Sequence, residues 1–178
     1  MKKFVIILTA AFVSAFVLGC GGEPSAPEIT EEPVQTQITE EPTQSMFDLA
    51  ETLRAAHNGK TELSYASSSD DDPESELAYV CDIDYGKVKD FLMLFAADGS
   101  KSADEIVVIV LKDQADVKTA VDMLSTHVEK RKALYDAYEP ALAKALNKAE
   151  VFSEGRCAVL IVSENAYDVR NAFMESIG

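Results

Sequence analysis

The sequence predicts an α+β domain, in which an antiparallel four-stranded sheet formed by two hairpins packs against three to four helices. Two pairs of apolar runs, each pair joined by a short polar turn, predict the hairpins. Amphipathic stretches with helical spacing lie before and after them and predict the helices. All of these patterns lie in residues 46–178, which is the length of one ordinary domain.

The first helix is expected over residues 46–57. Ser45 and Asp48 form a capping pattern in front of an apolar face, and Asn58-Gly59 is a typical helix stop. Residues 67–76, with the sequence SSSDDDPESE, contain almost nothing that could be buried cheaply. We therefore expect an exposed loop there.

Both hairpins are predicted from apolar runs separated by a turn. Residues 91–97 and 106–111 are the first pair, and residues 151–153 and 157–162 are the second. Strands that are apolar at every position need cover on both faces of the sheet. If the helices after each hairpin cover one face, we expect residues 46–80 to cover the other, with a second copy or an unknown partner as the alternatives.

Three further helices are expected in the second half of the chain. The first runs from residue 115 to about 138 on an apolar stripe, Pro140 interrupts it, and a short helix follows to about residue 148. The last covers residues 166–176. Residues 107–121 align with residues 159–173 at an offset of 52. This similarity predicts that the domain consists of two ββα halves, and a chance match between similar elements is the alternative.

The N-terminus has the pattern of an export signal. Two lysines precede residues 4–18, an apolar run that is shorter than the ~20 residues of a transmembrane helix. The run ends in Val17-Leu18-Gly19-Cys20, which resembles a bacterial lipobox. The resemblance implies a signal peptide at residues 1–19 and a mature chain that begins at Cys20, carrying a diacylglyceryl thioether and an N-acyl chain such as palmitate. A simple secretory signal with a coincidental cysteine is the alternative.

The lipidated Cys20 and residues up to 45 are expected to form a disordered acidic tether. Residues 21–45 contain six Glu and four of the six Pro of the chain, but no Lys, Arg or aromatic residue. The whole chain has 16 basic and 31 acidic residues and a net charge of -15, and residues 46–178 have 14 and 25 and a net charge of -11. Such acidity argues against nucleic acid or an anionic membrane surface as an electrostatic partner.

Residues Tyr79 to Ser163 resemble a known family. The DYGKVKDF turn, the ADEIVVI strand, the helix ending in YDAYEPALAKALNKAE and the closing SEGRCAVLIVSENA hairpin are similar to those of bacterial lipoproteins that carry the domain of unknown function numbered 4358. The resemblance covers most of residues 46–178 and rests on the order of elements, without a catalytic signature. It implies no specific function.

The histidines and cysteines are the first candidates for chemistry. His57 and His127 are the only imidazoles, and neither lies in a metal or triad motif, so a structural role is favoured for both. Cys81 and Cys157 have apolar neighbours and are expected to be buried thiols. A disulfide between them is the alternative that an exported compartment allows.

No cofactor, metal or catalytic residue is expected. The carboxylates at residues 70–72 and 82–84 fail the spacing of an EF-hand loop, which leaves weak calcium binding as an alternative. The chain has no Gly-rich phosphate loop, nucleophile elbow, HExxH or CxxC motif.

Arg131 is the candidate binding residue. It lies within the apolar stripe of the long helix, whereas Lys130 and Lys132 lie outside the stripe. An Arg in such a position is usually paired or marks an edge. We hypothesise that Arg131, Tyr135 and Tyr138 form a polar patch where a ligand or partner docks, and an intramolecular ion pair of Arg131 is the alternative.

Together these patterns favour a non-enzymatic interaction or accessory module. Lipid on Cys20 would hold it on the extracytoplasmic face of the cell membrane, with an envelope protein as a partner and no nucleic acid. The first alternative is a small-ligand-binding lipoprotein associated with a transporter, which a deep pocket lined by Arg131 and the tyrosines would favour. The second is an envelope enzyme, which would need His57 or His127 beside carboxylates in a cleft.

Overall fold

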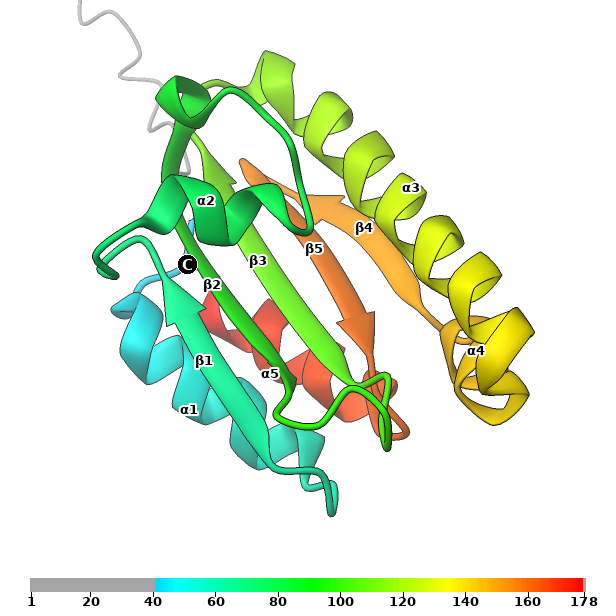
Figure 1. The fold of residues 1–178 in the computed structure, drawn as a ribbon. Helices are drawn as coiled ribbons and strands as arrows, with labels where there is room; N and C mark the ends of the chain where they lie inside the picture. Colours follow the sequence, from blue (N-terminus) through cyan, green and yellow to red (C-terminus); the bar gives the residue numbers. More distant parts are fainter. Residues whose placement is uncertain (1–40, 178) are drawn as a thin grey trace, which may run out of the picture. The chain divides into compact units, whose positions relative to one another are not determined.

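The computed structural model describes residues 41–177, which fold into a five-stranded antiparallel sheet with helices on both faces (Figure 1). The strand order is β1-β2-β3-β5-β4. The elements in chain order are α1 (Met46–His57), β1 (Leu63–Ser67), α2 (Pro73–Ala78), a single 3-10 turn η1 (Tyr85–Lys87), β2 (Val88–Ala96), β3 (Glu105–Leu111), α3 (Gln114–Tyr138), α4 (Pro140–Leu146), β4 (Glu150–Glu154), β5 (Cys157–Val162) and α5 (Ala166–Ser176).

The mixed helix and sheet composition, both hairpins and the long helices agree with the prediction. α1 has the predicted bounds because its ends are capped locally. The backbone N–H of Asp48 donates to Ser45 Oγ at 3.2 Å, and Asn58 closes the helix in the left-handed conformation with φ 42°. Pro140 separates α3 from α4 and is the first residue of α4, where its missing N–H costs no hydrogen bond.

The predicted four-stranded sheet is wrong, because β1 adds a fifth strand at one edge. β1 pairs with β2 from Leu63 opposite Ala96 to Ser67 opposite Leu92. α2 is a second element that the sequence analysis missed, since it begins inside the segment expected to be a loop. Its first turn is fixed by Pro73 and by the Asp72 side chain, which accepts a hydrogen bond from Ser75 N at 3.4 Å.

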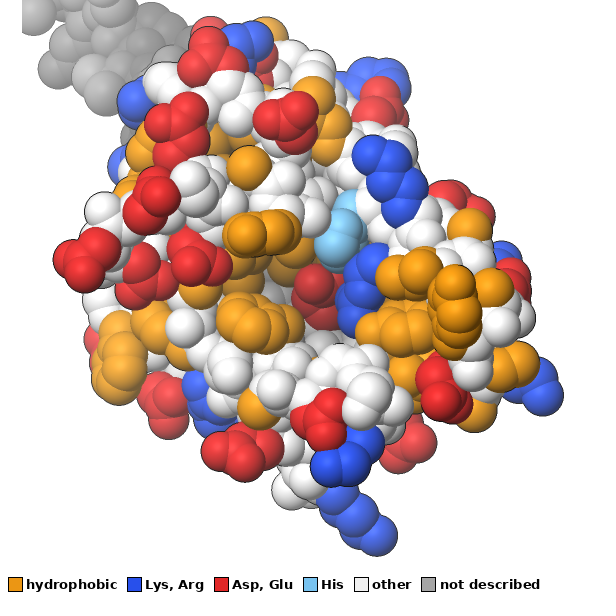
Figure 2. Space-filling view, in the orientation of Figure 1, with side chains coloured by type: hydrophobic (Ala, Val, Ile, Leu, Met, Phe, Trp, Pro, Cys, Tyr) orange, Lys and Arg blue, Asp and Glu red, His pale blue; other side chains and the backbone are white. Residues whose placement is uncertain are grey.

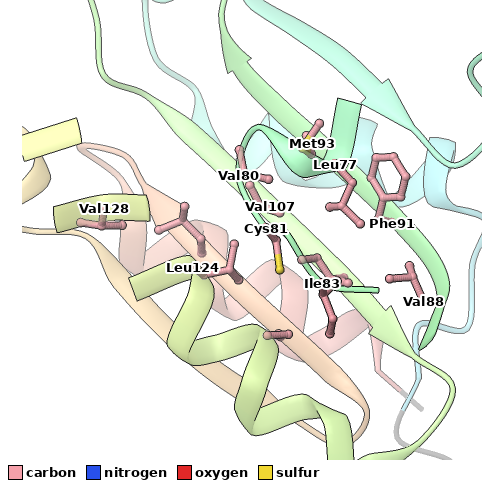
Figure 3. Packing of buried hydrophobic residues seen from close by; sticks show 14 of the residues in the cluster. Leu77, Val80, Cys81, Ile83, Val88, Phe91, Met93, Val107, Leu124 and Val128 are labelled. Carbon is pink, nitrogen blue, oxygen red and sulfur yellow. The ribbon is translucent and has the colours of Figure 1, made fainter. Parts of the chain in front are cut away.

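Alternate residues of the central strands enter two separate hydrophobic cores. In β3, Val107 lies in the core beneath α3, and Val108 lies in the core beneath α1 and α5. Figure 1 shows α2 and α3 on one side of the sheet and α1 and α5 on the other. α2 and the segment after it complete the first core, where Leu77, Val80 and Ile83 lie close to β2 and β3 (Figure 3).

Cover for both faces therefore comes from this chain, as expected, but the helices are distributed differently. α3 and α5 follow the two hairpins and lie on opposite faces of the sheet. The offset of 52 aligns Val107 with Val159, and these residues also lie in opposite cores. β3 and β5 are antiparallel neighbours, so a two-fold axis that exchanged them would be perpendicular to the sheet. Such a symmetry would place α3 and α5 on the same face. The two ββα units thus share an order of elements without a symmetric arrangement.

The last residues of the predicted tether contact the domain. Thr43 N donates to Ser176 O at 2.9 Å, Pro42 forms an isolated bridge with Ile177, and Glu41 forms ion pairs with Lys89 and Arg156. The predicted signal peptide, Cys20 and the tether up to residue 40 lie outside the described residues. Within residues 41–177, no helix combines the length and the apolar character that a membrane crossing requires.

Candidate functional site

A pocket of about 470 Å³ opens between the segment after α2, the adjacent ends of β2 and β3, and the middle of α3. Figure 2 shows this hollow with a histidine, an acidic and a basic side chain at its base and hydrophobic side chains around it. The apolar lining includes Tyr79, Val80, Met93 and Phe95. The pocket thus combines an apolar wall with a small polar floor, which is the usual make-up of a small-ligand site.

The floor consists of Glu105, His127 and Arg131, brought together from two elements. Glu105 is the first residue of β3 and lies opposite Phe95 and Val162 in the sheet. His127 and Arg131 are four residues apart in α3, so they lie one above the other on the same helix face. α3 packs across the sheet and places that face over the start of β3.

A buried carboxylate holds the floor together. Glu105 is 6% exposed, and its Oε2 accepts hydrogen bonds from His127 Nε2 at 2.9 Å and from Arg131 Nη1 at 2.8 Å. A buried charge is costly unless it is paired and hydrogen-bonded, and Arg131 supplies both the opposite charge and a donor. The predicted alternative for Arg131, an intramolecular ion pair, is therefore present in the structure, and the same side chain also lines the pocket.

Part of the floor stays free for a ligand. Both donors use Glu105 Oε2, and no hydrogen bond among the described residues engages Oε1. The Arg131 guanidinium likewise donates through Nη1 alone among these residues. Among the described residues, neither side chain has a fully buried polar atom without a partner, so the unused atoms keep some exposed surface. The pocket accordingly presents an acceptor oxygen beside several N–H donors.

The two predicted tyrosines take different positions. The Arg131 guanidinium carbon lies 5.6 Å from the centre of the Tyr135 ring, and the Tyr135 hydroxyl donates to Gly99 O at 2.9 Å. Tyr135 therefore holds Arg131 in place from outside the pocket. Tyr138 is the last residue of α3 and is 76% exposed, without a part in the pocket lining.

Most of this site carries no signal in the sequence. The sequence favours a structural role for His127 and predicts no role for Glu105 or for Tyr79, which is 81% exposed at the pocket wall. One signal was available for His127, since its spacing of four residues from Arg131 puts both on one helix face. The pairing with Glu105 spans 22 and 26 residues and could not be seen locally.

A second polar cluster surrounds His57, which is 3% exposed. His57 Nδ1 lies 2.8 Å from Ser163 Oγ, and His57 Nε2 lies 3.7 Å from Asp104 Oδ2, too far for a hydrogen bond. Asn165 N donates to the same Ser163 hydroxyl oxygen, and the Asn165 side chain donates to His57 O. The cluster ties the end of α1 to the end of β5. It supports the structural role expected of His57.

The two cysteines are free, buried thiols in different cores. Cys81 belongs to the core beneath α3, and Cys157 belongs to the core beneath α1 and α5, so the sheet separates them. The predicted alternative of a disulfide is therefore wrong. Burial raises the pKa of Cys81 to about 11 and that of Cys157 to about 12, which disfavours a thiolate at neutral pH.

No group of three or more His, Cys, Asp or Glu side chains within residues 41–177 is placed to hold a metal ion.

A family model described as a domain of unknown function, DUF4358, matches residues 61–163, which is more than half of the chain. The match runs from the start of β1 to the end of β5, so it includes the pocket wall and all three residues of the floor. No curated protein and no solved structure matches the chain.

Proposed function

We propose that this chain, which belongs to the DUF4358 family, is a lipid-anchored, non-enzymatic module. In this proposal it binds a small ligand on the extracytoplasmic face of the cell membrane. The pocket over Glu105, His127 and Arg131 carries the binding part of this proposal. Its volume of about 470 Å³ lies within the ~300–1,000 Å³ of ordinary small-molecule sites.

The anchoring part of the proposal rests on the N-terminal sequence. The positive n-region, the short apolar run and the lipobox-like end at Cys20 support lipidation. Each buried CH2 of an acyl chain contributes roughly 0.8 kcal/mol, so two or three chains on one cysteine hold a protein stably at a membrane. Replacing Cys20 by Ala should move the protein from the membrane fraction to the soluble fraction, and an unchanged distribution would contradict this part.

Isolation of the ligand tests the binding part. The full chain, extracted from its own cells in mild detergent, should release a small molecule on denaturation that mass spectrometry detects. Tyr79→Ser should reduce the amount recovered, because it removes a pocket wall. Tyr167→Ser is a matched control, since Tyr167 is 73% exposed on α5 and lines none of the described pockets. Equal recovery from native and Tyr79→Ser protein would contradict ligand binding in this pocket.

The second candidate function is that of a ligand receptor that associates with a transporter. The pocket lined by Arg131 favours it, because a module that only binds other proteins would not need such a pocket. Crosslinking in intact cells, with the native chain beside Cys20→Ala, would test it. Stoichiometric recovery of one membrane transporter with the anchored form alone is the expected result. Recovery of a different envelope protein would instead indicate an accessory subunit.

The non-enzymatic character is also part of the proposal. His127 beside Glu105 in a pocket is the arrangement that an enzyme would need. However, the pocket lining includes no Ser, Thr or Cys among residues 41–177, and His127 and Arg131 both bond to the same carboxylate oxygen. The co-purified ligand should be recovered chemically unchanged after incubation with fresh protein, and its conversion would contradict this reading.

A further inference from the structure

We propose that the ligand carries an uncharged planar group with an adjacent hydrogen-bond donor and acceptor, such as a carboxamide, on an elongated apolar body. This inference rests on the proposed ligand-binding function and specifies the chemistry that the pocket takes. Three features of the pocket support it: the unused polar atoms of its floor, the balance of its charges, and the shape of its apolar part.

The unused atoms of the floor define the polar group of the ligand. Glu105 Oε1 can accept a hydrogen bond, and the remaining Arg131 nitrogens can donate. A carboxamide satisfies both at once, because its NH2 group donates and its carbonyl oxygen accepts. A pure acceptor such as a carboxylate would leave Glu105 Oε1 facing another oxygen without a proton.

The charges of the floor favour a neutral ligand. Glu105 and Arg131 carry opposite charges and already form an ion pair at 2.8 Å. An anion would place a further negative charge near Glu105 and Glu76, so the two carboxylates of the lining oppose it most strongly. A cation would approach Arg131, and an ammonium group has no acceptor for the Arg131 N–H groups. Either ion would in addition lose its hydration on entry, a cost that a neutral amide largely avoids.

The apolar body is expected to be elongated along α3. A smaller hollow of about 150 Å³ adjoins the pocket and shares Tyr79, Val80 and His127 with it. Its lining also includes Met123, one turn closer to the start of α3, together with the polar side chains of Asp82, Thr126 and Lys130. Val80 and Tyr79 thus line both hollows, so an extended apolar ligand would contact them along its length.

Calorimetric titration with three matched probes tests the inference. Phenylpropanamide, phenylpropanoate and phenylpropylammonium share one apolar body and differ in the end group. The protein is the full chain in mild detergent, and each probe is dissolved in the same solution. We expect phenylpropanamide to bind about tenfold more tightly than either ion.

Two variants that each remove one charge of the floor make the test reciprocal. Glu105→Gln leaves the Arg131 charge uncompensated, so phenylpropanoate should gain about tenfold relative to the amide. Arg131→Gln leaves the Glu105 charge, so phenylpropylammonium should gain instead. Lys132→Gln is the control, because it removes a positive charge from the same helix outside this pocket and should leave the order unchanged. The two variants report independently, so misfolding of one leaves the other informative.

The outcomes separate this inference from the proposed function. Tighter or equal binding of an ion by the unmodified chain, or an order that both variants leave unchanged, overturns the inference. If Tyr79→Ser still weakens binding in that case, the pocket remains the ligand site. Failure of all three probes to bind overturns the inference, and an empty pocket in protein from native cells would overturn the proposed function separately.

Discussion

Replacing Arg131 by Ala should destabilise the domain by about 2 kcal/mol, through the loss of its bond to Glu105. A hydrogen bond to a charged group contributes roughly 1.5–3 kcal/mol, and breaking a buried ion pair costs roughly 3–5 kcal/mol. The Arg131 side chain is 19% exposed and the pocket admits water, so the lower range applies. For a domain of this size about 2 kcal/mol corresponds to a fall in Tm of roughly 6–10 °C.

Urea unfolding of four proteins measures the pair itself. The unmodified chain, Arg131→Ala, Glu105→Gln and the double variant form a double-mutant cycle, for which we expect a coupling free energy of about 1–2 kcal/mol. Lys132→Ala on the same helix should change stability by less than about 0.5 kcal/mol, like most surface substitutions. Additive effects of the two single changes would refute the reasoning, because they would mean that Glu105 and Arg131 do not stabilise each other.

An apolar double variant tests whether the ion pair between Glu105 and Arg131 stabilises the domain more than a pair of apolar side chains would. Glu105→Leu with Arg131→Met replaces the ion pair by apolar side chains, and such replacements are often neutral or stabilising by roughly 1–4 kcal/mol. We expect the double variant to fold at least as stably as the single variant Arg131→Ala, and to lose ligand binding. Retained binding would show that the polar floor does not take part in recognition.

Three further predictions concern other sites. Gly59→Ala should cost about 1–3 kcal/mol in thermal unfolding, because a Cβ there would lie 2.4 Å from His57 Nε2, and an unchanged Tm would contradict this packing. Burial raises the pKa of Cys81 to about 11 and that of Cys157 to about 12, so both thiols should resist iodoacetamide in the native protein at pH 8 and react in urea. Because the unfolded thiols ionise at a lower pH than the buried ones, the free energy of unfolding should fall as the pH rises above about 9. Asp98 has its pKa lowered to about 2, first by a lysine side-chain hydrogen bond, so its stabilising effect should be present above pH 4 and be lost as the pH falls toward 2; an acid-unfolding curve of Asp98→Asn identical to that of the native chain in this range would argue against it.

Local signals explain which elements the sequence predicted. α1 was predicted to its bounds because Ser45 and Asn58 act within one turn of the helix ends. β1 was missed because its partner residues in β2 lie 25 to 33 positions away, from Ser67 opposite Leu92 to Leu63 opposite Ala96. This edge strand has the sequence LSYAS, with three buried and two partly exposed residues, and it contains no continuous apolar run. Its identity therefore depends on a pairing that is not local.

The site was predicted less completely than the fold, for a related reason. Arg131 could be identified because a charged residue within an apolar helical stripe is unusual in itself. Glu105 gave no such signal, because a charged residue at the start of a strand usually marks the end of a solvent-exposed turn. Its burial becomes visible only when α3 lies across the sheet and brings Arg131 to 2.8 Å.

The position of the polar floor supports a functional reason for it. All residues of β3 except Glu105 are apolar and buried. An apolar residue at position 105 would therefore have given a fully apolar contact with α3. The chain instead places Glu105 there, binds it with two side chains from α3, and leaves one carboxylate oxygen and part of a guanidinium open to a pocket. A pair selected for stability alone would favour a bidentate bond, in which both carboxylate oxygens accept from the guanidinium, because that arrangement is stronger than the single hydrogen bond between Arg131 and Glu105. Accessible, preorganised donors and acceptors beneath an apolar wall are what a ligand site requires.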